Sequence, residues 1–300
     1  MTTSGDYVKL HFIVFLWGFT AILGKLISIP TVEMVFYRTL IAAAALGLLL
    51  AFRKKSLTIK RSTIITLILT GFIVSFHWIT FFGAARLSNV SVSLVGFATA
   101  SLWTAILEPL SNREKIKGYE IILGLVVICG IVVIFSFDFK YRVGFLVGML
   151  SGLLASVFSI INARFIRRTD AYSITFYEMV GATLGIALFF PFYKTFFALN
   201  GELQLSPTSL DWLYIAILAL ACTVYAFTVM VELMKRVSVF FIQLTVNLEP
   251  VYGIIMALII FKDEEKMSWK FYLGTMIILS AVLAYPYLKR KFDKSVTLDG

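Results

Sequence analysis

The stretch STIITLILTGFIVSFHWITFF, residues 62–82, decides the fold class of this chain. It contains no Asp, Glu, Lys or Arg, and the basic stretch RKKSLTIKR at 53–61 bounds it on one side. An α-helix rises about 1.5 Å per residue, so about 20 apolar residues cross the roughly 30 Å hydrocarbon core of a bilayer with their backbone hydrogen bonds made internally. The stretch therefore predicts a membrane-spanning helix.

Nine further apolar stretches share the length and the polar boundaries of this one. Together they explain a composition of 60% hydrophobic and 15% charged residues, whereas a soluble domain carries roughly 25% charged residues. We therefore predict an all-α integral membrane protein with ten transmembrane helices. The other nine stretches lie near residues 8–28, 32–52, 90–110, 117–137, 143–163, 172–194, 210–232, 238–261 and 269–288.

The basic residues are distributed unevenly along the chain. A formal net charge of +10 would suit a nucleic-acid-binding protein, but these residues separate apolar stretches and form no basic face. With both termini in the cytoplasm, the inner connectors hold most of the 27 Lys and Arg, in agreement with the positive-inside rule. We expect a multi-pass protein of the cytoplasmic membrane with both termini inside. Its expected partners are the lipid bilayer and a small-molecule substrate, with no nucleic acid, and we treat it as a monomer.

The two halves of the sequence resemble each other. FYR at 36–38 matches FYE at 176–178, and a second set of residues recurs farther along the chain: Arg86, Ser88, Glu114 and LG at 123–124 match Arg236, Ser238, Glu264 and LG at 273–274. Because each half holds an odd number of predicted spans, the second half must enter the membrane in the opposite sense. We predict two inverted five-helix repeats, residues 1–137 and 138–290, followed by a cytoplasmic tail, 291–300. Such repeats are typical of alternating-access carriers, which bind substrate near the midplane between the halves.

Glycines at helical spacing indicate close helix packing. Gly144, Gly148 and Gly152 lie one turn apart in one predicted span, and Gly181 and Gly185 repeat the pattern in the next. Small residues at this spacing let neighbouring backbones approach each other.

Several motifs, taken in order, resemble those of a known family. They are LWG at 16–18 with Lys25 and Pro30, FYR at 36–38, LEPVYG at 248–253, the acidic turn at 263–265 and YLG at 272–274. The chain resembles the EamA-like branch of the drug/metabolite transporter superfamily over nearly its whole length. The resemblance implies ten helices in two inverted repeats and transport, often export, of amino acids, nucleobases or related metabolites, without a cofactor or metal.

The sequence departs from the family pattern in its fourth span. Proteins of this kind usually carry a proline about 13 residues before the acidic turn of each half. The second half keeps Pro250, whereas Ser101 lies near the corresponding position of the first half. We therefore expect the fourth span to be straighter than the ninth.

Ionisable side chains inside the predicted spans are candidates for function, because charge in hydrocarbon needs a partner or a wet cavity. Arg38 can bind a substrate carboxylate or join helices through carbonyls and acids. Glu249 lies beside Pro250, whose missing amide proton predicts a helix break that coordinates a proton or ligand, or a simple kink. Glu178 is a candidate inner gate residue or a partner for nearby arginines, and Lys25 is expected to snorkel to the interface.

A second group of candidates is aromatic or polar. Aromatic walls with a few polar groups suit neutral or zwitterionic metabolites, and we expect the members of this group to line a cavity between the spans. They are Trp17, Thr20, Tyr37, His77, Trp78, Ser101, Trp103, Tyr225 and Asn247.

Signatures of catalysis are missing from the sequence. It contains no GxxxxGK phosphate-binding loop and no HExxH metal motif. Its two cysteines, Cys129 and Cys222, lie in apolar stretches and predict no disulfide framework. The favoured hypothesis is a secondary transporter that exports small organic metabolites and is not an enzyme. The alternatives are an intramembrane lipid-modifying enzyme and, less favoured, a channel or scaffold.

Overall fold

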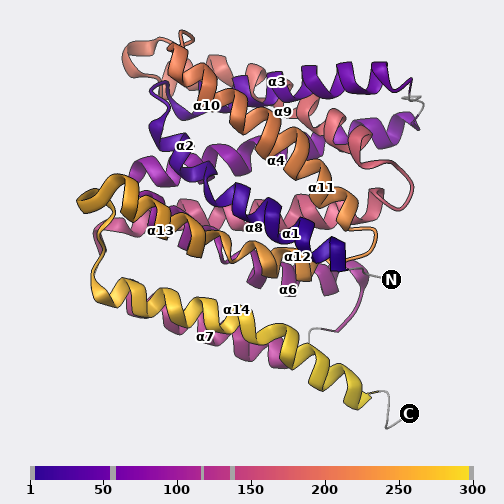
Figure 1. Ribbon diagram of the computed structural model, residues 1–300, viewed down its shortest axis with the longest axis vertical. Coiled ribbons are helices and arrows are strands. Elements are labelled where there is room, and N and C mark those ends of the chain that lie inside the picture. The colour runs from indigo at the N-terminus through magenta and orange to yellow at the C-terminus, as the bar shows by residue number, and fades with distance from the viewer. Residues whose placement is uncertain (1–3, 55–58, 116–117, 136–138, 297–300) are drawn as a thin grey trace.

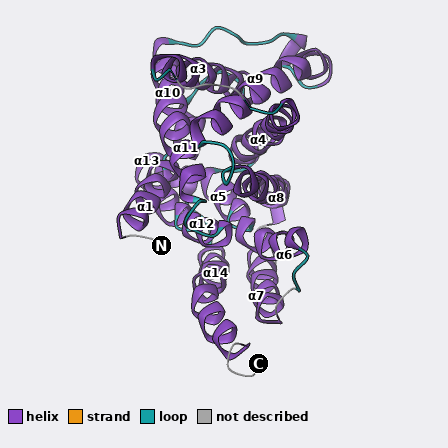
Figure 2. Cartoon of the chain, turned by 90° about the vertical axis from the view of Figure 1, so that its right-hand side faces the viewer, coloured by secondary structure: helices purple, strands orange, loops and turns teal. Residues whose placement is uncertain are grey.

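The computed structural model describes residues 4–54, 59–115, 118–135 and 139–296, and within these ranges the chain is helical with no strand (Figures 1 and 2). The helices run roughly side by side as one bundle, and the described chain ends lie toward the same end of it (Figure 1). The predicted boundary between the halves at 137 and 138, and the last predicted tail residues, 297–300, lie outside the described residues.

The first half contains seven helices. They are α1 (Ser4–Gly18), α2 (Thr20–Leu26), α3 (Thr31–Phe52), α4 (Arg61–Leu87), α5 (Val90–Phe97), α6 (Ala100–Asn112) and α7 (Gly118–Phe135).

The second half contains the remaining helices and several short helical turns. They are η1 (Phe139–Tyr141), α8 (Arg142–Phe165), α9 (Ala171–Phe196), η2 (Leu199–Gly201), α10 (Ser209–Ala219), the π-helical segment η3 (Leu220–Tyr225), α11 (Ala226–Leu233), α12 (Val239–Val246), α13 (Glu249–Phe261), η4 (Lys262–Glu265) and α14 (Trp269–Val296).

Seven of the described helical segments are long and apolar enough to cross a bilayer, which confirms the membrane class. They are Ser4–Leu26, Thr31–Phe52, Arg61–Leu87, Val90–Asn112, Arg142–Phe165, Ala171–Phe196 and Ser209–Leu233. Helix α7, the pair α12 and α13, and α14 lie where the sequence predicts the other three spans. The total of ten spans remains a prediction, and α14 continues as a helix beyond the predicted end at 288.

Four of the helical segments are interrupted part-way along their length. Breaks separate α1 from α2 at Phe19, α5 from α6 at 98–99, and α12 from α13 at 247–248, and η3 widens the helix between α10 and α11. The break predicted beside Pro250 is present, since α13 begins at Glu249 with proline in its first turn. These breaks leave backbone groups without their usual helical partners at one level of the bundle.

The expectation that the fourth span is straighter is wrong. Its break contains no proline: the Thr99 hydroxyl donates to the carbonyl of Gly96 at 2.8 Å and competes with the helical pattern. Glycines of α8 fit against this segment, and a Cβ added to Gly152 would lie 2.9 Å from the carbonyl oxygen of Phe97. The predicted close packing of α8 is therefore present, and it holds the interrupted fourth span in place.

Matching elements of the two halves make matching contacts. The packing of α4 on α8 corresponds to that of α11 on α1, and the packing of α6 on α8 corresponds to that of α13 on α1. Two further pairs join an element to its own counterpart, α3 with α9 and α7 with α14, and the contact of α5 with α13 corresponds to that of α12 with α6. The α7–α14 pair lies at the side of the bundle, away from α3 and α10 (Figures 1 and 2). These correspondences fit the internal repeat found in the sequence.

The backbones of α4 and α9 touch through glycine, which gives a first prediction. A Cβ at Gly181 would lie 2.1 Å from the carbonyl oxygen of Ile68, whereas a Cβ at Gly83 would meet no atom within 4 Å. We expect Gly181→Ala to destabilise the protein by at least about 1–3 kcal/mol, the usual cost of overpacking. Gly83→Ala should be neutral or slightly stabilising, because it only removes glycine's entropy cost in a helix. Thermal unfolding in detergent measures both, and equal stability of the two variants would contradict the close contact.

Candidate functional site

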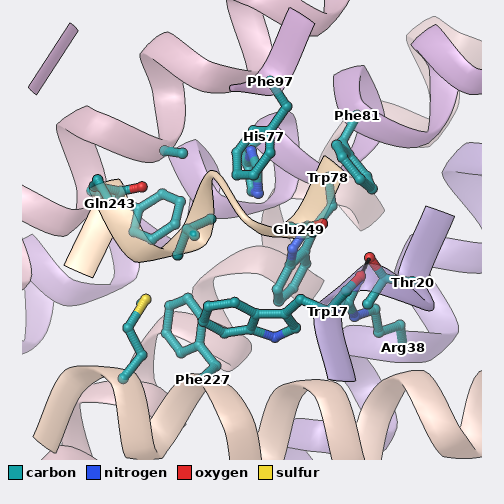
Figure 3. A pocket seen from close by; sticks show the side chains of 14 residues that line it. Trp17, Thr20, Arg38, His77, Trp78, Phe81, Phe97, Phe227, Gln243 and Glu249 are labelled. Carbon is teal, nitrogen blue, oxygen red and sulfur yellow. Dashed lines mark hydrogen bonds between the residues drawn. The ribbon is translucent and has the colours of Figure 1, made fainter. Parts of the chain in front are cut away.

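A cavity lies at the level of the helix breaks, inside the bundle (Figure 3). Its empty space is about 490 Å³, a volume that includes open solvent at its entrance. Both halves of the chain contribute to its wall, which is mainly aromatic. The lining residues are Trp17, Thr20, Arg38, His77, Trp78, Phe81, Phe97, Ala155, Phe158, Phe227, Met230, Gln243, Val246 and Glu249.

Arg38 supplies a positive charge to this cavity from α3. Its side chain is almost fully buried, and its guanidinium lies 3.9 Å from the centroid of the Trp78 ring. The Arg38 Nε donates a hydrogen bond to Thr223 Oγ1 at 2.9 Å. Cation–π contact and a hydroxyl acceptor stabilise the buried charge in part. The terminal nitrogens of the guanidinium have no hydrogen-bond partner among the described residues, so they can bind an anionic group.

The π-helical segment η3 supplies the polar groups that face Arg38 and Trp17. Thr223 Oγ1 donates to the carbonyl of Leu218 at 2.8 Å, and the freed carbonyl of Cys222 accepts a hydrogen bond from Trp17 Nε1 at 2.9 Å. A π-bulge displaces carbonyls from the regular i to i−4 pattern and is frequent at functional sites. The bulge thus positions two cavity side chains from the first half against the second half.

His77 contributes a hydrogen-bond acceptor. Its Nδ1 lies 3.0 Å from the carbonyl oxygen of Ser151, which can only accept, so Nδ1 carries the proton. The Ser151 hydroxyl in turn donates to the carbonyl of His77 at 3.0 Å. Nδ1 also lies 2.8 Å from the Ser151 Oγ. In its neutral form the ring is thus held in one tautomer, with Nε2 as the acceptor. Phe97 and Phe158 lie against its faces, with ring centroids 5.4 Å away in each case.

Glu249 supplies a carboxyl group to the same cavity. It is 3% exposed and lies at the first residue of α13, next to the break. Its carboxyl makes no hydrogen bond or ion pair with the described residues, and Arg38 is the charged group that acts on it across the cavity. A carboxyl and a guanidinium that face one cavity without binding each other can bind a ligand that carries both signs of charge.

The structure brings together six of the residues that the sequence singles out. Trp17, Thr20, Arg38, His77, Trp78 and Glu249 all line the cavity (Figure 3). They come from four different helical spans.

The other singled-out residues lie outside the cavity lining. The Tyr37 hydroxyl donates to the carbonyl of Leu205 at 2.8 Å, and Tyr225 is 44% exposed and packs against Phe12. Ser101 donates to its own helix, and the Trp103 Nε1 and the Asn247 amide nitrogen are buried without a described partner. Pro250 follows Glu249 in the first turn of α13. Glu178 is fully buried and bonded to Asn162, not to Arg164 or Arg168 as the sequence suggested.

Much of the cavity wall could not be identified from the sequence. Phe81, Phe97, Phe158 and Phe227 look like the other phenylalanines of an apolar chain, and nothing in their spacing distinguishes cavity from lipid contact. Gln243 carried a usable signal, because an uncharged amide within an apolar span needs partners. Its Nε2 donates to Ser159 Oγ at 2.8 Å.

Charged residues close one end of the bundle. Lys25 Nζ lies 3.1 Å from Glu264 Oε2 and 3.2 Å from Glu265 Oε1. The Glu265 carboxylate is fully buried and accepts from the backbone amides of Val90 and Ser91, each at 3.0 Å, which caps the N-terminus of α5. We call Lys25, Glu264, Glu265, Val90 and Ser91 the Lys25 latch. The sequence favoured snorkelling of Lys25 to the interface, and the structure places its ammonium group in ion pairs with the acidic turn at this end of the bundle.

Two further charged residues, the buried Asp211 and the exposed Arg86, bind the end of α2 and the connector that follows it. Asp211 accepts hydrogen bonds from the backbone amide of Ser28 at 2.7 Å and from its hydroxyl at 2.6 Å. Arg86 donates to the carbonyls of Gly24, Ile27 and Ile29. The exposed Asp263 is separate from the latch, because it pairs with Lys266 instead. The hydrogen bond from Lys266 lowers the pKa of the Asp263 carboxyl below its ordinary value.

A second cavity hollows the opposite end of the bundle, between α6, α8 and α12. Its empty space is about 920 Å³, a volume that includes open solvent at its entrance. Arg164 lies in its wall and donates to the carbonyl of Ser111 at 2.6 Å. The lining residues are Glu108, Asn112, Ile160, Ala163, Arg164, Phe165, Arg167, Arg168 and Val239. Ion pairs thus join α2 to the acidic turn at one end, and a cavity lined by polar and apolar residues hollows the other.

Comparison with known proteins gives a family match and a fold match. A sequence model of the EamA-like transporter family matches residues 8–136 and 142–285. No curated protein matches the chain. A crystal structure of a protein shares the fold with a TM-score of 0.70 and 17% sequence identity, and the match covers 96% of this chain and 100% of the other.

The contact between Arg38 and η3 gives a second prediction. Thr223→Val removes the hydroxyl that accepts from Arg38 Nε, and hydrogen bonds to charged groups contribute about 1.5–3 kcal/mol. We expect a loss of stability of that order. Thr228→Val is the matched control, because the buried Thr228 Oγ1 has no partner among the described residues and its removal should be neutral or stabilising. Thermal unfolding that ranks the two variants in the reverse order would contradict this assignment.

Proposed function

Because the chain belongs to the EamA-like transporter family of the drug/metabolite transporter superfamily, we propose that it is a secondary transporter that exports small organic metabolites by alternating access. Family membership makes it a membrane transporter. The substrate class, the direction and the mechanism are argued from the cavity and from the two ends of the bundle.

An inverted repeat of five spans supports alternating access. The matching contacts of the halves fit a twofold relation, and α3 with α9 and α7 with α14 pair across its axis. Ten spans with both termini in the cytoplasm also place most basic connectors on the inner side. The main cavity then lies between the repeats at the level of the interrupted helices, where carriers of this architecture bind substrate.

The difference between the two ends favours an inward-open conformation and export. The Lys25 latch closes the end opposite the chain termini, whereas the Arg164 cavity hollows the end at which the termini and most basic connectors lie. Substrate would enter from the cytoplasm past Arg164 and leave after the latch opens.

The cavity suits a small zwitterionic or neutral metabolite. Arg38 can bind a carboxylate, Glu249 can bind an ammonium group or a coupling proton, and His77 Nε2 can accept from an N–H donor. The aromatic rings between them suit an apolar side chain or a planar base. The single observation that carries this proposal is that Glu249 and Arg38 face one cavity without a direct ion pair. Amino acids and nucleobases meet these requirements, whereas a multiply phosphorylated substrate would need more buried cations.

Ligand binding gives a third prediction. In a thermal-shift screen of purified protein against L-amino acids and nucleobases, a ligand that binds the native state raises the unfolding temperature. We expect at least one compound to do so, and we expect Glu249→Gln and Arg38→Lys to weaken its binding by about tenfold or more, or about 1.4 kcal/mol. Glu232→Gln is the control, because Glu232 is half exposed beside Lys235 and outside the cavity.

Transport in proteoliposomes completes this test. The stabilising compound should move across the membrane in the wild type and more slowly in Glu249→Gln. Proteoliposomes that move no amino acid, nucleobase or drug in a broad screen would overturn the proposal, as would chemical conversion of lipid by the purified protein.

The Lys25 latch gives a fourth prediction. Lys25→Met removes the charge that binds Glu264 and Glu265, so the state open at that end should become more populated. Ile22→Cys, introduced after both native cysteines are replaced by alanine, reports on this state because Ile22 is 2% exposed and lies on α2. We expect Lys25→Met to raise its rate of modification by a membrane-impermeant maleimide several-fold. Lys266→Met, which breaks only the exposed pair with Asp263, should leave the rate unchanged. Equal rates in the two variants would show that the latch closes nothing.

A further inference from the structure

A buried carboxyl lies outside the main cavity and takes no part in its wall. Glu178, on α9, is fully buried, and its only partner among the described residues is the amide of Asn162 on α8. Asn162 Nδ2 donates to Glu178 Oε2 at 3.2 Å. An ionised carboxylate with a single neutral partner is very costly in an apolar interior.

The neighbouring helices provide no countercharge. Helices α3, α4 and α11 pack against α9, and α8 contacts it through Asn162. The charged residues and histidine on these four helices are Glu33, Arg38, Arg61, His77, Arg86, Arg142, Arg164 and Glu232. Among the described residues, none of these groups has a hydrogen bond or ion pair with Glu178.

The α4 side of Glu178 is closed by backbone. A Cβ added to Gly71 would lie 2.2 Å from the Glu178 carbonyl oxygen, and one added to Gly181 would lie 2.1 Å from that of Ile68. No space for water separates α4 from α9 at these positions. On the α8 side the Glu178 carboxyl meets the polar side chain of Asn162, so the structure offers a polar path on this side.

The pair of Glu178 and Asn162 leaves two acceptors without a donor. Glu178 Oε1 and Asn162 Oδ1 are both buried and both unpartnered among the described residues. A buried unpartnered polar atom requires an explanation. Two acceptors cannot bond to each other, but a proton on Glu178 Oε1 would supply the missing donor. The acid and the amide would then form a reciprocal pair, with each donating to the other.

A polar route leads from this pair to the main cavity. Ser159 lies one helical turn before Asn162 on α8 and accepts a hydrogen bond from Gln243 Nε2 at 2.8 Å. Gln243 lines the cavity, and its Oε1 is buried without a described partner. Gln243 at the cavity bonds to Ser159, and Asn162, one turn farther along α8, bonds to Glu178, so polar side chains follow α8 from the cavity to the carboxyl.

We propose that Glu178 is a proton-binding site of the transporter, separate from the substrate cavity and connected to it through Asn162, Ser159 and Gln243. In the loaded state the proton is on Glu178 Oε1. On release the O–H bond breaks, the electron pair stays on the carboxylate and the proton passes to water on the cavity side. The part of this proposal that couples the proton to substrate movement rests on the proposed function, whereas the site itself does not.

Infrared spectroscopy of the purified protein in lipid tests the site without any substrate. At neutral pH we expect a carbonyl band of a protonated carboxylic acid that is lost in Glu178→Gln and kept in Glu232→Gln, the exposed control. Glu249→Gln assigns any contribution from the cavity carboxyl. Transfer to heavy water should shift the Glu178 band, because its proton exchanges. An unchanged band in Glu178→Gln, or a Glu178 band that heavy water does not shift, would overturn the proposal.

Two further measurements separate a functional proton from a structural one. Glu178→Gln should unfold at the wild-type temperature, since its amide can donate to Asn162 Oδ1 as the acid does; a large decrease would point to a structural carboxylate. Gln243→Leu should keep the band but slow its exchange several-fold. Unchanged exchange in Gln243→Leu would contradict the route.

Proteoliposomes that contain a mixture of radiolabelled L-amino acids as the probe test the coupling. In the wild type a pH gradient should change the rate of movement, and in Glu178→Gln movement should continue without response to the gradient. A response kept in Glu178→Gln would overturn the coupling. If the wild type moves none of the probe while the infrared results hold, the proposed function fails and the proton site stands.

Discussion

Backbone polar groups inside a bilayer must find partners within the protein, and the rest of this structure depends on how it meets that constraint. Four helical segments are interrupted at one level, and their freed groups require hydrogen bonds there. The carbonyl of Cys222 binds Trp17, and Thr223 binds both Leu218 and Arg38. The same interruptions that create a need for partners also place polar and charged side chains around a cavity.

The sequence identifies the chemistry of this site better than its geometry. Arg38 and Glu249 were found because an ionisable residue in an apolar stretch stands out against its neighbours. Tyr37 and Tyr225 carried similar polar signals but lie elsewhere, because the rotation of each helix depends on packing against other spans. A single sequence does not indicate which face of each helix points toward the cavity. For the same reason, the phenylalanines of the cavity wall could not be distinguished from those that face lipid.

The fold was predictable where one residue type determines the outcome and less so where several small effects combine. Length and hydropathy predicted the helices, and Pro250 predicted the break before α13. The break in the fourth span depends on the Thr99 hydroxyl and on glycines of α8 that lie far away in sequence. The ion pairs of Lys25 also join distant segments, so the sequence of α2 alone could not indicate them.

The glycine contact between α4 and α9 has a mechanical consequence. Helices whose main chains touch without intervening side chains cannot slide or rotate past each other without collision, so α4 and α9 form one rigid unit. Glu178 lies within this rigid unit, on α9, whereas Trp17 and Glu249 flank interruptions in other segments. In the proposed alternating-access cycle, motion would then occur by bending at the interruptions, and the buried carboxyl would stay on the part that does not bend.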